Sequence, residues 1–111
     1  MLYAIIALFA LAAVAGLLIL KNWLTAQNTS QLLVYGHGIV AAGGLILLIA
    51  YFLNHKTTNV QASLILFVVA AIGGFYMFFR DLKGKMSPVW FAVVHGLIAV
   101  GGFIFLLLLV I

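Results

Sequence analysis

The chain of 111 residues lacks cysteine altogether and has a single carboxylate side chain, Asp81. Without thiols, disulfide scaffolds, thiolate metal sites and cysteine nucleophiles are excluded. One carboxylate cannot form a paired acid and base, a carboxylate-rich Mg²⁺ or Ca²⁺ site, or a Ser-His-Asp arrangement inside apolar segments. The sequence therefore excludes these classes of catalytic and metal-binding site.

Charge of either sign is also scarce. Only 5% of the residues are charged while 68% are hydrophobic, and the mean hydropathy is +1.42. A monomer of this composition could not remain soluble, so the chain is expected to be an integral membrane protein in contact with the lipid bilayer. The net charge of +4 comes from five Lys and Arg at the ends of the apolar runs. They indicate membrane topology and lipid-headgroup contact, and no nucleic-acid partner is expected.

The apolar residues fall into four runs, over residues 2–20, 32–53, 60–79 and 89–111. Each run is long enough to cross about 30 Å of hydrocarbon as a helix that rises about 1.5 Å per residue. The connectors are short and polar, which favours antiparallel neighbours, with Ser87 and Pro88 as N-cap and first residue of the last helix. The first run lacks the features of a signal peptide and is expected to persist as a helix. The predicted fold is an all-α transmembrane four-helix bundle, with residues 1–111 as a single domain.

The orientation follows from the positions of the basic residues. Four of them lie in the first and third connectors, and Lys56 alone lies in the second. The positive-inside rule places the first and third connectors in the cytoplasm and both termini outside. The four residues of the cytoplasmic connectors are Lys21, Arg80, Lys83 and Lys85.

The chain resembles itself when it is shifted by 58 residues without a gap. His37-Gly38 then matches His95-Gly96, and Gly43-Gly44 matches Gly101-Gly102. These matches are less easily produced by chance than the accompanying alanine and leucine matches. They predict two tandem parallel-repeat helical hairpins, residues 1–53 and 59–111, related by a pseudo-two-fold axis along the membrane normal.

Such an axis would place His37 and His95 at one depth, within the hydrocarbon and on the cytoplasmic side of its midplane. Small residues follow each histidine at helical spacing and suggest a shallow floor below it. The first and third helices bring further small residues to the histidine level. The two floors are formed by Ala41 with Gly44 and by Ala99 with Gly102, and the facing small residues are Ala12, Gly16, Ala70 and Gly74.

An ionisable side chain inside a membrane span is costly and suggests a function. A structural zinc would need about four N or S ligands, which the spans do not supply. Haem iron needs only two axial ligands, because the porphyrin supplies four nitrogens. Haem b held by His37 and His95 is the leading hypothesis. The alternative is a cofactor-free structural or interaction subunit whose histidines form hydrogen bonds between helices. A proton or solute pathway is disfavoured, because no chain of titratable residues continues from the histidines.

The His-Gly pairs followed by small residues resemble the haem-bearing helices of bacterial b-type cytochromes of the cytochrome b561 kind. The whole chain is also similar to small four-helix bacterial membrane proteins built from such hairpins. The resemblance implies that His37 and His95 are axial ligands and that Gly38 and Gly96 ease the approach of the porphyrin. It implies a bacterial inner-membrane location. Larger members of the group have more histidines in their spans, which leaves a second haem in doubt.

The predicted activity is electron exchange near the cytoplasmic face with a quinol or a partner redox protein, or haem carriage or sensing. Arg80 is the expected partner of the haem propionates, because a guanidinium binds carboxylates well. The sequence leaves open whether the protein is an enzyme, which redox partner it has, and whether it forms a homo-oligomer.

Overall fold

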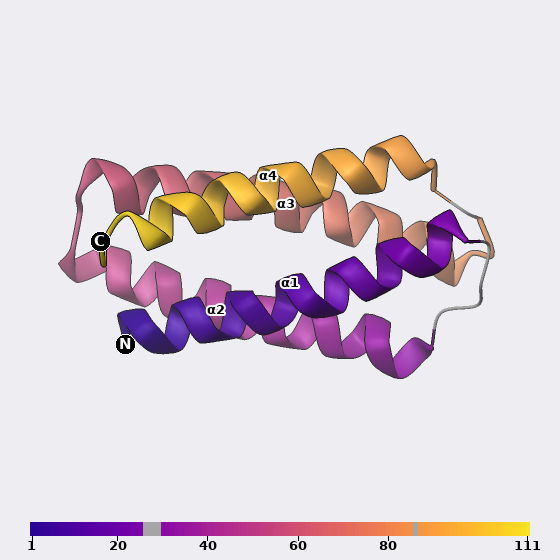
Figure 1. Ribbon diagram of the computed structural model, residues 1–111, viewed down its shortest axis with the longest axis horizontal. Coiled ribbons are helices and arrows are strands. Elements are labelled where there is room, and N and C mark those ends of the chain that lie inside the picture. The colour runs from indigo at the N-terminus through magenta and orange to yellow at the C-terminus, as the bar shows by residue number, and fades with distance from the viewer. Residues whose placement is uncertain (26–29, 86) are drawn as a thin grey trace.

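The computed structural model describes residues 1–25, 30–85 and 87–111, which form four α-helices (Figure 1). All four helices are long and apolar enough to cross a membrane, which confirms the prediction of an all-α chain with four spans. Residues 26–29 of the predicted first connector and residue 86 of the third lie outside the described residues. The helices are α1 (Leu2–Leu24), α2 (Gln31–Asn54), α3 (Thr58–Leu82) and α4 (Val89–Leu107).

Two helices continue beyond the apolar runs that predict them. The last turn of α1 contains Lys21 and the last turn of α3 contains Arg80. A cation near a helix C-terminus interacts favourably with the helix dipole and the free carbonyl groups, so a basic residue there does not end the helix. The end of α4 is shorter than predicted, because the helix stops at Leu107 and a turn follows.

The two helix starts on the second hairpin differ in their capping. At α3, the Thr57 hydroxyl accepts a hydrogen bond from the Val60 amide at 3.3 Å, as an N-cap does. At α4, the predicted Ser87 cap is wrong. Pro88 is the N-cap residue and no side chain caps the helix. The reason is the backbone of Pro88, whose ψ of 143° is extended, so the helical conformation begins one residue later.

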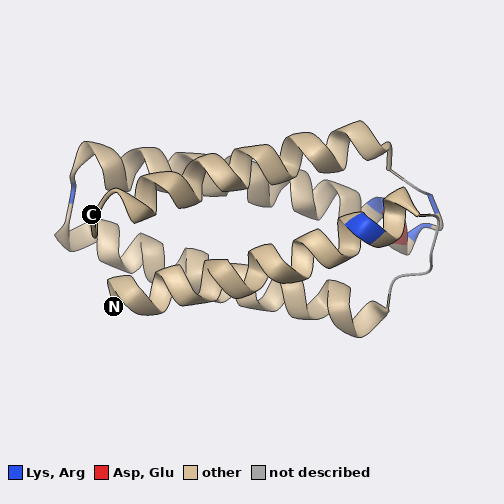
Figure 2. Ribbon diagram, viewed as in Figure 1, with Lys and Arg blue, Asp and Glu red and all other residues tan. Residues whose placement is uncertain are grey.

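The helices form two antiparallel pairs, α1 with α2 and α3 with α4 (Figure 1). The pairs meet through α1 against α4 and α2 against α3, which leaves α2 and α4 diagonal to each other. Both termini lie at one end of a body measuring 41 × 22 × 19 Å. The basic residues gather at the opposite end, at the first and third connectors, and Lys56 marks the end with the termini (Figure 2).

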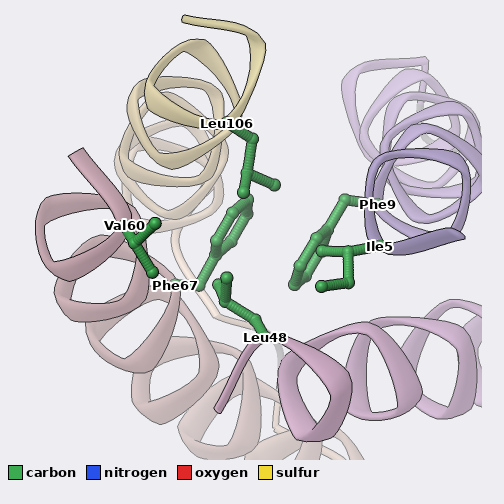
Figure 3. Close-up of a cluster of buried hydrophobic side chains, with 6 residues drawn as sticks. All are labelled: Ile5, Phe9, Leu48, Val60, Phe67 and Leu106. Atoms are coloured by element: carbon green, nitrogen blue, oxygen red, sulfur yellow. The ribbon is translucent and has the colours of Figure 1, made fainter. Parts of the chain in front are cut away.

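The fully buried apolar side chains gather in one cluster between the four helices (Figure 3). At its centre, the rings of Phe9 and Phe67 stack with centroids 3.8 Å apart and planes within 4°. Because these rings come from α1 and α3, the stack joins the two hairpins. The cluster consists of Ile5, Phe9, Leu48, Val60, Phe67 and Leu106.

Full burial is confined to the half of the bundle that contains the termini. The buried helix residues all lie there, and in α1 and α3 the last of them are Ala12 and Ala70. In the half nearer the basic connectors, helix residues 13–24, 31–43, 71–82 and 89–101 include no buried residue. The histidines lie at the start of this less buried half.

Candidate two-histidine site

His37 on α2 and His95 on α4 face each other across the bundle. Their ring centroids are 6.3 Å apart and their planes cross at 75°. This separation is too large for direct stacking and too small for another helix to lie between the rings. The structure therefore brings together the two spanning histidines that the sequence singles out.

A carbonyl group of the neighbouring helix fixes the ring of His37. Its Nδ1 lies 2.7 Å from the Ala12 carbonyl oxygen of α1. Because a carbonyl can only accept, Nδ1 carries the proton and donates it, and Nε2 keeps the free lone pair. Gly16, one turn along α1, makes room for the ring, since a Cβ atom there would lie 3.1 Å from His37 Cε1. The His37 imidazole is thus oriented with its acceptor nitrogen available.

His95 of α4 packs against α3 in a comparable way. A Cβ atom at Gly74 would lie 3.1 Å from its Cε1, and the backbone of Ala70 lies beside the ring. The Ala70 backbone approaches this ring as the Ala12 carbonyl approaches His37, but the contact of the buried Nδ1 atom does not meet hydrogen-bond geometry. The two imidazoles therefore share their packing but differ in how firmly a hydrogen bond holds them.

The expected open floor below the histidines is filled. A Cβ atom at Gly44 would lie 3.2 Å from the Phe9 ring, and one at Gly102 would lie 3.0 Å from the Phe67 ring. The stacked phenylalanines lie directly against these glycines, so a side chain at either position would crowd a ring. The two rings therefore close the space on the side of the histidines that faces the termini. The repeated phenylalanine was the sequence signal for this feature, although pattern alone does not reveal that the rings meet.

The other small residues predicted for the site lie around its margin. Ala41 and Ala99 are half-buried, and so is Gly96, whereas Gly38 is exposed on the outer surface. A Cβ atom at Gly38 or Gly96 would meet nothing within 4 Å. These two glycines leave open space beside the histidine helices and pack against no described residue there.

Arg80 interacts with an aromatic residue that the sequence analysis did not single out. Its Nη1 donates to the Tyr76 hydroxyl at 3.4 Å, and its guanidinium carbon lies 5.7 Å from the centre of the Tyr76 ring. Tyr76 in turn contacts Phe91 of α4, with ring centroids 5.3 Å apart. Tyr76 is one turn from Arg80 on α3, and this spacing was the available signal.

The donor atoms suit a metal that requires only two protein ligands. Among the described residues, no group of three His, Cys, Asp or Glu side chains could hold a metal ion. A metal–imidazole bond is about 2.0 Å long and a ring centre lies about 1.1 Å from each ring atom, so two axial imidazoles have centres about 6.2 Å apart. The observed separation of 6.3 Å agrees with that value.

Comparison of the chain with models of protein families, with curated proteins and with solved structures finds no match. The residues and their geometry are therefore the basis for assigning a function.

Proposed function

We propose that the protein is a membrane-embedded b-type cytochrome in which His37 and His95 are the axial ligands of one haem b. The observation that supports this proposal best is the placement of two imidazoles with centroids 6.3 Å apart. The hydrogen bond from His37 Nδ1 to the Ala12 carbonyl leaves Nε2 to bind iron, and such a bond from the other ring nitrogen orients a ligand and raises its basicity.

The uneven burial of the bundle supports the presence of a large planar group, because full burial ends just before the histidine level. A porphyrin between the histidines would extend into the less buried half, toward the basic connectors. Its propionates would be held there by cationic side chains, of which Arg80 is the first candidate. Phe9 and Phe67 would exclude water and lipid from the opposite side.

Haem would supply reversible one-electron chemistry, and the protein would set its ligation, its orientation and its exposure to water. The proposal includes electron exchange with a quinol or a partner redox protein on the cytoplasmic side of a bacterial inner membrane. Haem carriage or sensing would use the same two ligands. Both termini would then lie outside.

The proposal also treats the two hairpins as tandem copies related by a pseudo-two-fold axis. Equivalent contacts 58 residues apart support it. His37 packs on Gly16 as His95 packs on Gly74, and Phe9 packs on Gly44 as Phe67 packs on Gly102. A symmetric pair of ligands on one metal would follow from this duplication.

A second candidate function has one observation in its favour. The bond between His37 and the Ala12 carbonyl joins α1 to α2, which is the interhelical role expected of a histidine in a cofactor-free structural subunit. The Ala70 backbone of α3 takes the equivalent place beside His95, but this role does not require His95 to face His37. The haem proposal accounts for both histidines.

The test is the absorption spectrum of the protein purified from cells supplied with haem. We expect a Soret band with one haem per chain and a low-spin, six-coordinate iron. Replacing either His37 or His95 with Ala should produce a high-spin spectrum or remove the haem, because one axial ligand is lost.

His55→Ala is the matched control, because His55 is exposed at the other end of the bundle and its ring stacks on Tyr51. This variant should keep the spectrum of the unchanged protein. A colourless protein that is nevertheless folded would refute the cytochrome proposal and favour the structural one.

A further inference from the structure

A groove runs along the outer surface of the second hairpin, between α3 and α4, and reaches His95 at its base. Its volume is about 250 Å³ and the side chains around it are otherwise apolar. The rim is open, since Ile72 and Trp90 are each 65% exposed. Gly73 gives the groove depth, because a Cβ atom there would approach Phe91 and His95. A groove of this shape and lining fits a hydrocarbon chain.

One end of the groove continues into a polar, cationic group of side chains. Phe91 lines the groove and contacts Tyr76, and Tyr76 accepts a hydrogen bond from Arg80 at 3.4 Å. Arg80 lies in the last turn of α3, at the end of the bundle where the basic residues gather (Figure 2). Apolar surface thus leads to positive charge within one hairpin, as in a site for an anionic amphiphile.

The first hairpin has a similar groove that lacks the pair of Tyr76 and Arg80, although Lys21 lies in the last turn of α1. The groove between α1 and α2 has a volume of about 330 Å³ and reaches His37. The positions 58 residues before Tyr76 and Arg80 are occupied by Leu18 and Asn22. The two hairpins therefore offer similar space for a chain but differ in what they offer a headgroup.

We propose that the groove between α3 and α4 binds one anionic phospholipid. The acyl chain lies along Ile72, Gly73 and Trp90, and the phosphate is bound by Arg80 with the Tyr76 hydroxyl beside it. Charge complementarity selects the headgroup, because a guanidinium forms charge-assisted hydrogen bonds with phosphate. The first hairpin has Leu18 and Asn22 in place of this hydroxyl and guanidinium, so we expect weaker selectivity from the groove between α1 and α2. This proposal does not depend on the presence of haem. It assigns Arg80 to the lipid phosphate, which would leave Lys21, Lys83 and Lys85 for haem propionates.

Native mass spectrometry of the full chain, released from detergent with defined lipids, tests which lipid headgroup the groove prefers. We expect one phosphatidylglycerol to be retained in preference to phosphatidylcholine. Arg80→Gln should weaken phosphatidylglycerol binding about tenfold, because a charge-assisted hydrogen bond is lost. Lys83→Gln is the matched control, since it removes the same charge from an exposed residue of the same connector. It should leave the affinity unchanged.

Photo-crosslinking with a phosphatidylglycerol that carries a diazirine in its acyl chain tests the groove itself. The label should map to residues 69–98, and Gly73→Leu, which fills the groove, should reduce it several-fold. Equal retention of both lipids, or an equal loss of affinity in Arg80→Gln and Lys83→Gln, would overturn the proposal in favour of diffuse attraction by the basic end. Equal labelling of α1 and α2 would also overturn it.

Discussion

At the scale of single residues, the candidate site depends on what surrounds two imidazoles. The Ala12 carbonyl determines which nitrogen of His37 carries the proton, and the missing side chains of Gly16 and Gly74 allow both rings to lie against the neighbouring helices. A larger residue at either glycine position would occupy the space of a ring. The identity of a residue on α1 or α3 therefore controls the placement of a histidine on α2 or α4.

Gly16→Ala tests this control. The added Cβ atom would lie 3.1 Å from His37 Cε1, so the ring must move away from its position opposite His95. We expect haem affinity to fall about tenfold, since overpacking of this kind costs about 1–3 kcal/mol. Haem titration followed by the Soret band measures the effect.

Gly38→Ala is the matched control for Gly16→Ala, because a Cβ atom at Gly38 meets nothing within 4 Å. It should bind haem as the unchanged protein does. If Gly38→Ala loses haem and Gly16→Ala does not, the porphyrin lies along the outer face of α2 and the proposed site is wrong.

At the scale of the helices, ring stacking joins the two hairpins, and a buried polar contact joins the two helices of the second hairpin. Phe9 and Phe67 stack across the bundle, and the buried Ser63 hydroxyl donates to the Gly102 carbonyl at 2.9 Å. Lipid is as apolar as the helix surfaces, so close packing and hydrogen bonds contribute more to helix association in membranes than apolar burial does. Each glycine lies against the ring of its own hairpin, Gly44 against Phe9 and Gly102 against Phe67, and the two rings then meet between the hairpins.

Gly102→Ala should destabilise the bundle. A Cβ atom at Gly102 would lie 3.0 Å from Phe67 Cε2, and Phe9 on the opposite face of that ring limits its movement. We expect a loss of about 1–3 kcal/mol in the free energy of unfolding. Reversible unfolding in mixed detergent micelles measures it.

Gly43→Ala provides the comparison, because the same change on α2 meets nothing within 4 Å. It should be neutral or should stabilise the bundle by up to about 1 kcal/mol through higher helix propensity. Equal destabilisation by both substitutions would show that helix backbone effects, and not the phenylalanine stack, explain the loss.

At the scale of the whole molecule, the two ends of the bundle differ in charge and in packing. The basic residues gather at the first and third connectors (Figure 2), and the tightly packed cluster lies toward the termini. The histidines lie between the cluster and the basic end. The positive-inside rule predicts that the histidines are nearer the cytoplasmic face, and under the proposed function a redox partner would approach from that side.

Labelling of single cysteines in this cysteine-free chain tests the orientation. Cysteines at Ser30, Asn54 and Lys85 would all be exposed at the ends of the bundle. An impermeant thiol reagent added to intact cells should modify the Asn54→Cys variant and leave the other two unmodified. The reverse pattern would mean that the bundle is inverted and that electron exchange takes place on the outer side.

The sequence by itself determined the class of fold and the setting. Long apolar runs in a chain with 5% charged residues can satisfy their backbone groups within a bilayer only as helices or as closed barrels, and spans of this length favour helices. The sequence also identified the histidines and the small residues opposite them, because a 58-residue period makes both visible. Helical spacing further predicted that Ala12, Gly16, Ala70 and Gly74 lie at the histidine level, as the contacts of Gly16 and Gly74 confirm.

Only the tertiary structure decided how this level is filled. Periodicity assigned Gly44 and Gly102 to an open floor, whereas the rings of Phe9 and Phe67 occupy that space. Likewise, the separation of 6.3 Å between the imidazole centroids depends on side-chain rotamers and on how closely the hairpins approach. The distance between the rings and the filling of the space below them depend on contacts between residues far apart in the chain. Local sequence patterns do not determine these contacts.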